Sequence, residues 1–236
     1  MTWPGWLGFA HYCPTSKDLM PPFLWDAATG QEVAALRGHT GDVNSASYSP
    51  DGGRIITASS DGTARVWNAA TGHRVAALRC QGGVLSATFS PDGARIITAS
   101  WDGTARLWDA ATGQKVAVLR GQAAAVRRAS FSPDGACIVT ASSDGTARLW
   151  DTTTGQEIAA LRGHIGEVNS VSFSPDGGSI VTASSDGTAR LWDAATGQEI
   201  ARIALDAAVS AVSVNSGSIA LGDALGRVHV FDSAEL

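Results

Sequence analysis

Residues 38–78 read GHTGDVNSASYSPDGGRIITASSDGTARVWNAATGHRVAAL, and this stretch decides the fold. Side chains alternate over residues 43–49, and a Ser-Pro-Asp-Gly turn follows at residues 49–52, where Pro presets φ and Gly supplies a positive φ. The β-branched run at residues 54–59 leads into Asp61-Gly62, a dipeptide that favours tight hairpins. Two more short strands are expected over residues 63–67 and 74–78. The stretch therefore predicts a meander of four antiparallel strands.

The same motifs return along the chain with little change. Ser-Pro-Asp-Gly stands at residues 49–52, 90–93, 132–135 and 174–177, and Asp-Gly-Thr-Ala-Arg stands at 61–65, 102–106, 144–148 and 186–190. Trp-Asp or a near copy recurs about every 42 residues, at residues 25–26, 67–68, 108–109, 150–151 and 192–193, with Phe231-Asp232 as a weak last copy. Both faces of one meander are apolar or small, so only units stacked around an axis can bury them. This arrangement is a β-propeller.

Composition excludes several classes of protein. The net charge of −5 and the pI of about 5.4 argue against a nucleic-acid surface, which usually carries a basic stripe. The sequence has no continuous apolar run of about 18 residues, so no membrane span is expected, and its first residues lack the basic segment of a signal peptide. Cys13, Cys80 and Cys137 share no metal or redox spacing. We therefore expect a cytoplasmic protein with structural thiols and no cofactor or metal.

The motifs, in register over residues 23–232, resemble the WD40 repeat family, and they are similar to bacterial WD40 arrays that form sensor modules of signalling NTPases and kinases. The resemblance implies an all-β propeller and a role in protein–protein interaction. The sequence contains no P-loop motif and no kinase signature, so the effector part of such proteins is not expected in this chain.

The resemblance also implies a hydrogen-bonded tetrad in each repeat, because a buried His and Asp are costly unless each is paired. Its members would be the His of Gly-His, a Ser or Thr of strand b, the Asp of the tight turn and the Trp of strand c. The first complete repeat offers His39, Thr57 or Ser59, Asp61 and Trp67, and the fourth offers His164, Thr182 or Ser184, Asp186 and Trp192. Gln81 and Gln122 are expected in place of His beside the pairs Asp102/Trp108 and Asp144/Trp150. Because these sets recur in each repeat, we interpret them as structural and not as catalytic triads.

The strand count predicts five blades. Complete repeats are expected at residues 38–78, 79–120, 121–162 and 163–205, and residues 206–236 supply three strands of a fifth blade. Residues 31–37 would add its outer strand and so close the ring and remove an exposed edge. Residues 1–22 lack the repeat motifs and are expected to be an irregular leader, flexible or left by truncation, ahead of a propeller over residues 23–236. The strand at residues 23–26 has no place in this scheme.

Candidate binding residues are those that vary among otherwise repeated positions. In WD40 domains partners often bind the face that carries the connections between blades and the turns between strands b and c, which we call the top face. Large aromatic residues and Arg are common interface anchors, and Trp101 stands where most other repeats have a small residue. The hypothesis is a peptide or protein site on this face, and its residues are Trp101, Arg127, Arg128, Leu85, Asp42, Asn44, Glu167 and Asn169.

Three functions remain open from the sequence. The first is a non-catalytic scaffold or sensor module that binds a protein or peptide, with neither nucleic acid nor membrane as partner. The second is a truncated propeller fragment of a larger signalling protein without independent function. The third, an enzyme that uses the central channel, is disfavoured because His11, His73 and His229 occupy unrelated repeat positions. The chain is expected to be monomeric if the ring closes and otherwise to self-associate.

Overall fold

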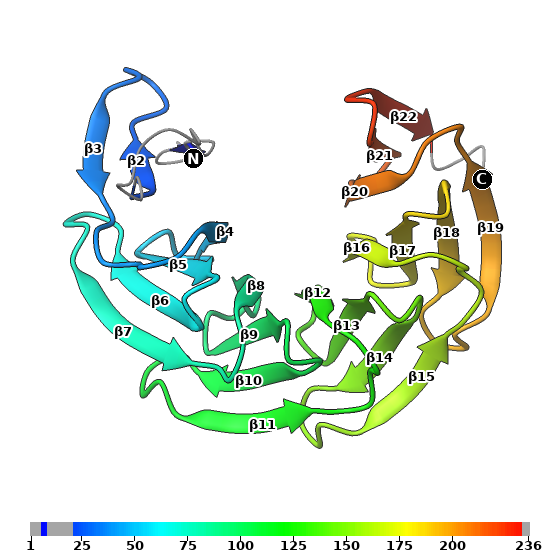
Figure 1. The fold of residues 1–236 in the computed structure, drawn as a ribbon, viewed down its shortest axis with the longest axis horizontal. Helices are drawn as coiled ribbons and strands as arrows, with labels where there is room; N and C mark the ends of the chain where they lie inside the picture. Colours follow the sequence, from blue (N-terminus) through cyan, green and yellow to red (C-terminus); the bar gives the residue numbers. More distant parts are fainter. Residues whose placement is uncertain (1–5, 9–20, 233–236) are drawn as a thin grey trace.

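The protein folds into an arc of antiparallel sheets. The structure, a computed structural model, describes residues 6–8 and 21–232. Figure 1 shows six sheets in chain order around an arc, with the first sheet and the last sheet on either side of an opening. The described part of the chain contains no helix long and apolar enough to cross a membrane. The all-β propeller architecture expected from the repeats is confirmed.

The first sheet consists of β1 (Trp6–Gly8), β2 (Phe23–Trp25) and β3 (Glu32–Ala35). Four complete sheets follow, which we call blades 1 to 4: β4 (Val43–Tyr48), β5 (Arg54–Ser59), β6 (Thr63–Asn68) and β7 (Arg74–Arg79); β8 (Val84–Phe89), β9 (Arg95–Ser100), β10 (Ala105–Asp109) and β11 (Lys115–Leu119); β12 (Val126–Phe131), β13 (Cys137–Ser142), β14 (Ala147–Asp151) and β15 (Glu157–Leu161); β16 (Val168–Phe173), β17 (Ser179–Ser184), β18 (Thr188–Asp193) and β19 (Glu199–Ala204). The last sheet consists of β20 (Val209–Val214), β21 (Ser218–Asp223) and β22 (Val228–Asp232).

Two local features shape each blade. The turn between strands b and c needs a left-handed residue, and in blade 1 Gly62 supplies it with φ of 81°. Strand a of each blade carries a bulge directly after its first Val, as between Val43 and Ser45. The bulge leaves Asn44 outside the regular ladder, so that its side chain can be aimed at something other than its own sheet. Sequence variation at the position of Asn44 therefore changes which side chain lies on the top face.

The hydrophobic core lies between blades, and each junction joins two different faces. One blade contributes aliphatic residues from strands b, c and d, and we call this its trailing face. The next blade contributes its leading face, which carries the Trp of strand c and the Phe of strand a. At the junction of blades 2 and 3 the trailing residues are Ile97, Ala99, Ala105, Leu107 and Leu119, and the leading residues are Val126, Ala129, Phe131, Ile138 and Trp150.

The expected closure of the ring is not found in the structure. Residues 31–37 were expected to complete the last blade, but β3 pairs with β2, and the last sheet contains only β20, β21 and β22. The reason is packing, because Leu36 is fully buried with Leu24 against Ile55 and Trp67 of blade 1. The outer strand is therefore held in the first sheet. The described chain forms an open arc of six sheets in place of a closed ring of five blades.

The interpretation of residues 1–22 as an irregular leader is also corrected in part. Trp6–Gly8 forms β1 and pairs with β2, with Trp6 opposite Trp25 and Gly8 opposite Phe23. This pairing gives the strand at residues 23–25 a place that the sequence count could not assign. The expectations for residues 1–5 and 9–20 lie outside the described residues.

Replacing a Trp inside a junction should cost far more stability than replacing the equivalent Trp beside the opening. Trp150 is 2 % exposed between blades 2 and 3, whereas Trp25 is 37 % exposed. Trp150→Ala should lower the free energy of unfolding by about 3–5 kcal/mol, the usual cost of emptying a Trp site. Trp25→Ala should lower it by about 1 kcal/mol or less. Urea unfolding of both variants tests this, and equal losses would contradict the arc.

Candidate partner-binding face

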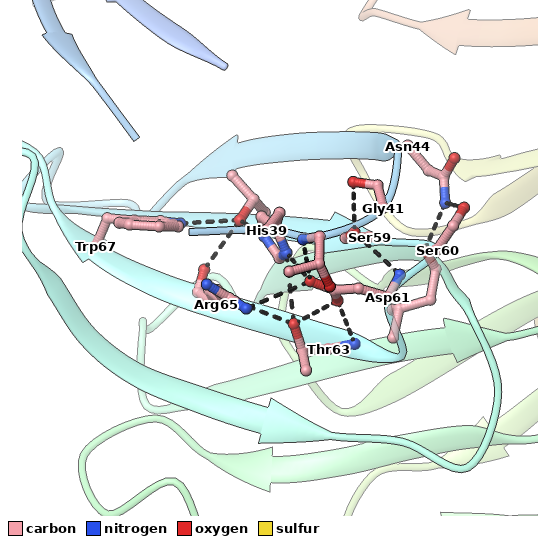
Figure 2. Close-up of polar contacts among 12 residues, drawn as sticks. His39, Gly41, Asn44, Ser59, Ser60, Asp61, Thr63, Arg65 and Trp67 are labelled. Carbon is pink, nitrogen blue, oxygen red and sulfur yellow. Dashed lines mark hydrogen bonds and ion pairs between the residues drawn. The ribbon is translucent and has the colours of Figure 1, made fainter. Parts of the chain in front are cut away.

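In blade 1 a chain of hydrogen bonds links the turn to the core (Figure 2). The Trp67 indole N–H donates to Thr57 Oγ1 over 2.8 Å, and His39 Nε2 lies 2.7 Å from the same oxygen. His39 Nδ1 lies 2.8 Å from Asp61 Oδ2. Because Thr57 receives the Trp67 proton, its own hydroxyl can donate to Nε2, which leaves the proton of a neutral His39 on Nδ1 for Asp61. The chain thus fixes one orientation for each of the four side chains.

The charges of this chain follow from burial and hydrogen bonding. Burial opposes ionisation of Asp61, but hydrogen bonds from Thr63, His39 and the Thr40 backbone outweigh it and hold the pKa of Asp61 far below its ordinary value. Burial lowers the pKa of His39 more than Asp61 raises it. The pair therefore consists of a carboxylate and a neutral imidazole. This charge state suits a structural role.

The hydroxyl in this chain is that of Thr57, and Ser59 has another task. Ser59 Oγ donates to Gly41 O over 3.0 Å and accepts from Asp61 N over 3.1 Å. Thr57 and Ser59 are two residues apart and lie on the same side of β5, so the sequence left both open. Blade 4 repeats the arrangement, with His164 Nε2 2.7 Å from Thr182 Oγ1, and Ser184 does not take the place of Thr182. Of the two hydroxyls that the sequence offers in each of these repeats, Ser59 or Thr57 and Ser184 or Thr182, the tetrad therefore uses Thr57 and Thr182.

Blades 2 and 3 replace the His in different ways. Cys80, four residues before Val84, holds the position that His39 holds before Val43, so the assignment of Gln81 is wrong by one residue. The Cys80 Sγ lies 3.7 Å from Thr98 Oγ1, and Asp102 pairs instead with Arg106 at 2.7 Å. In blade 3, Gln122 Nε2 donates to Thr140 Oγ1 over 2.9 Å. The indoles of Trp108 and Trp150 keep their hydrogen bonds to Thr98 and Thr140 in both blades.

The last sheet departs from the pattern. The Asp223 N–H donates to Arg227 O, as Ser142 N–H donates to Thr146 O in blade 3, and the Ala224 N–H donates to Ala208 O, as Ser185 N–H donates to Glu167 O in blade 4. Ala224 therefore flanks this turn, and Asp223 stands at the position of Ser184. Its carboxylate pairs with Arg227 at 2.6 Å and with His229 at 3.0 Å.

On the top face, the bulged residue of strand a links neighbouring blades. Asn44 Nδ2 donates to Ser60 Oγ over 3.0 Å within blade 1 and to Val84 O over 2.8 Å in blade 2. Asn169 makes the equivalent pair of bonds, to Ser185 Oγ at 3.0 Å and to Val209 O at 2.9 Å. We call this pair of bonds the staple. Both Asn residues of the predicted site thus have a structural role that the sequence did not reveal.

In blade 3 the staple position is occupied by Arg127, whose side chain is charged. Its Nε donates to Ser143 Oγ over 2.8 Å, and its Nη2 pairs with Glu167 Oε2 of blade 4. Arg127 and Glu167 therefore meet across the junction between blades 3 and 4. Arg128 is exposed as a whole residue, but burial around its guanidinium lowers the pKa of that group, and no side-chain hydrogen bond or ion pair engages it among residues 21–232. Asp42 is exposed at the start of blade 1, where its carbonyl accepts from Ser60 N.

Blade 2 lacks the staple because both of its partners are replaced. Leu85 stands at the position of Asn44, and Trp101 stands at the position of Ser60. The register supports this equivalence, because the bulge of β8 lies between Val84 and Ser86, with Leu85 outside the ladder. Trp101 is 57 % exposed, and Leu85 is half-buried. Blade 2 is thus the one complete blade without the polar pair, and its top face carries the apolar pair of Leu85 and Trp101 in that place.

A small ligand needs a pocket of sufficient volume, and a metal ion needs a group of ligating side chains. A pocket of about 170 Å³ beside the first sheet is lined by Pro21, Pro22, Arg37, Gly38, His39, Gly41 and Val43. Sites for drug-sized molecules usually measure about 300–1,000 Å³. Within residues 21–232, no group of three or more His, Cys, Asp or Glu side chains could hold a metal ion.

Sheets built on one repeated unit, with buried Trp residues between them, define a propeller-type repeat protein. The family model described as WD domain, G-beta repeat matches residues 30–68, 71–109, 113–151 and 155–193. These matches cover more than half of the chain, and the protein belongs to the WD40 repeat family.

Similar proteins match over single short segments. One is the Periodic tryptophan protein 2 homolog of Neurospora crassa, 39 % identical over 51 residues, which are 22 % of this chain and 6 % of that protein. Another is the guanine nucleotide-binding protein subunit beta-1 of Caenorhabditis briggsae, 45 % identical over 56 residues, which are 20 % of this chain and 16 % of that protein. The chain therefore spans a small part of the length of the curated relatives it matches.

Removing the Thr57 hydroxyl should cost more stability than removing that of Ser59. Thr57→Val leaves the Trp67 indole and His39 Nε2 without their shared partner in a fully buried place. We expect a loss of about 2–3 kcal/mol in the free energy of unfolding, since buried unpaired polar groups carry this penalty. Ser59→Ala should cost about 1 kcal/mol. Chemical denaturation measures both, and a larger effect at Ser59 would reject the assignment of Thr57.

The two buried His residues should also make stability depend on pH. Burial holds the pKa of His39 and of His164 below the ordinary value of 6.5, so the unfolded chain binds protons first. The free energy of unfolding should therefore fall as the pH drops through about 6.5. The double variant His39→Gln/His164→Gln should show a shallower slope between pH 7 and 5, because Gln122 already occupies this position in blade 3. An unchanged slope would show that neither His is buried in its neutral form.

Proposed function

We propose that this chain is a non-catalytic interaction module of the cytoplasm that binds a peptide or protein segment on its top face. The WD40 repeats support a scaffold role, and the repeat-by-repeat comparison supports this face. The free thiols of Cys80 and Cys137 fit a reducing compartment. The observation that carries the proposal is the exposed Trp101.

Trp101 stands apart from its equivalents in size and in environment. Ser60, Ser143 and Ser185 accept hydrogen bonds from the staple residues of their own blades, so their positions serve the fold. Trp101 cannot accept such a bond, and more than half of its side chain contacts solvent. A large aromatic side chain that gives up a structural role and remains exposed is the kind of residue that anchors a partner.

The surroundings of Trp101 suggest how a partner would be recognised. The residue lies against Gly83, where an added Cβ would come within 3.1 Å of its Cδ1 atom, and Gly83 in turn lies against Ser60 of blade 1. The Trp101 ring thus covers the boundary between blades 1 and 2, next to the staple of Asn44. Leu85 supplies apolar surface on the same blade. An apolar side chain of the partner would pack on this pair, while the neighbouring Asn44 and Asp42 remain at a polar rim.

The charges of the face limit the roles of the other candidates. Arg127 is already paired with Glu167, so using either charge for binding would break an inter-blade ion pair. Arg128 has no such engagement and can offer its guanidinium to a carboxylate of the partner. We therefore assign the anchor to Trp101 with Leu85 and a supporting contact to Arg128, and we assign Asn44 and Asn169 primarily to the fold.

The test uses variants that restore the repeat pattern. A random peptide display library is selected on the wild-type chain and counter-selected on Leu85→Asn/Trp101→Ser, which rebuilds the staple of blades 1 and 4. Selected peptides should bind Trp101→Ser at least about 30-fold more weakly, as expected when an anchor worth 2 kcal/mol is lost. Biolayer interferometry measures the affinities.

Stability separates binding from folding in this experiment. Because the double variant carries the residues of its sister blades, it should unfold at the same or a higher denaturant concentration than the wild type. Lys115→Ala, on the outer strand of the same blade, should leave peptide affinity unchanged. Peptides that bind wild type and Trp101→Ser equally would refute the proposed site.

A further inference from the structure

The opening of the arc exposes two sheet faces that are buried everywhere else in the described chain (Figure 1). One is the leading face of the first sheet, and the other is the trailing face of the last sheet. At every internal junction a trailing face meets a leading face, as Leu107 meets Trp150 between blades 2 and 3. The two faces at the opening are therefore the two different halves of the same junction.

The leading face of the first sheet carries Trp25. Its register matches that of the internal Trp residues, because a bulge separates Leu24 from Trp25 as another separates Val66 from Trp67. The internal Trp residues are 1–5 % exposed, whereas Trp25 is 37 % exposed and packs on Phe23 with ring centroids 6.2 Å apart. Trp25 is thus built like a junction residue, but no sheet among residues 21–232 packs against it as blades 1 to 3 pack against the Trp residues that follow them.

The trailing face of the last sheet carries the opposite half. Ala220 and Gly222 of β21 pair with Val230 and Val228 of β22. In blade 4 the equivalent residues, Val181, Ala183, Ala189 and Leu191, pack against the last sheet. Val228 is 73 % exposed and Val230 is 68 % exposed, whereas Ala189 is 1 % exposed. Within the described residues the last sheet has three strands, whereas each of blades 1 to 4 has four.

We propose that the opening is a docking site for a WD-type blade carried by another polypeptide. Such a blade has both required surfaces, a leading face with Trp for Val228 and Val230 and a trailing face with Ala and Leu for Trp25. The contact is head-to-tail, so one blade satisfies both ends of the arc. The contact of such a blade with each end sheet has the same two halves as the junctions between blades inside the chain. This likeness is the reason to identify the occupant as a blade of this type. A flat apolar peptide or a helix would match neither pattern.

The experiment supplies one blade in trans. The probe is a polypeptide with the sequence of residues 163–205, which contains blade 4 and its His164. One repeat cannot bury its two faces alone, so the probe should be unfolded in isolation and gain strand structure on docking. Mixing it with the full chain should give a one-to-one complex by sedimentation, β-sheet circular dichroism above the sum of the components, and a melting temperature that rises with probe concentration.

Variants at the opening connect binding to the two faces. Val230→Asp and Trp25→Ala should each weaken probe binding at least tenfold, and neither should change the folding of the free chain, because both side chains are exposed there. Val75→Asp is the matched control, since Val75 is 62 % exposed on the outer strand of blade 1 and should leave binding unchanged. A probe with Trp192→Ala should also bind more weakly.

Three results would overturn the proposal. The first is no complex at any probe concentration, and the second is equal loss of binding in Val230→Asp and Val75→Asp. The third is light scattering that shows a dimer of the wild-type chain which Val230→Asp disrupts, because this would make a second copy the occupant. These outcomes do not bear on the Trp101 site, which lies on the top face and is tested with separate variants.

Discussion

The whole structure depends on the burial of one face of a sheet against the different face of the next. A single meander has apolar residues on both sides and no interior of its own, so every blade gains its core from its neighbours. In blades 1 to 4 the Trp of strand c fills the junction with the preceding sheet, and its indole N–H donates to a Thr hydroxyl that also contacts His, Gln or Cys. The hydrogen-bonded side chains in Figure 2 thus hold the Trp67 indole in the orientation that fills the apolar junction.

This constraint also explains what the surface is free to do. A position that takes part in a junction or a turn repeats along the chain, because each blade needs it. Leu85 and Trp101 break the repeat together, and both partners of one hydrogen-bonded pair become apolar at once. Such a paired change removes the donor and the acceptor of the bond within the blade together, and the top face gains an aromatic surface.

Local features could be predicted from the sequence and long-range ones could not. The strand expected at residues 54–59 is β5, and the Asp61-Gly62 turn lies where the dipeptide placed it, because turn chemistry and alternation are local. The prediction of closure failed because it depends on long-range packing: Leu36 is buried with Leu24 against Ile55 and Trp67 of blade 1, which holds β3 in the first sheet. Thr57 could not be separated from Ser59 because they share one side of a strand. Counting four residues back from Val84 would have found Cys80 in place of Gln81. The inter-blade role of Arg127 required knowing that Glu167 lies across the junction.

The central claim is that the chain forms an open arc whose ends carry two unpaired halves of a junction. The most direct measurement is the distance between spin labels on Thr29→Cys in the first sheet and Ser216→Cys in the last, with the native cysteines replaced by Ser. Asp92→Cys and Thr153→Cys, at the equivalent turns of blades 2 and 3, give the reference distance for adjacent blades. The account predicts a clearly longer distance for the first pair than for the reference pair. Equal distances would mean that the ring is closed and would contradict it.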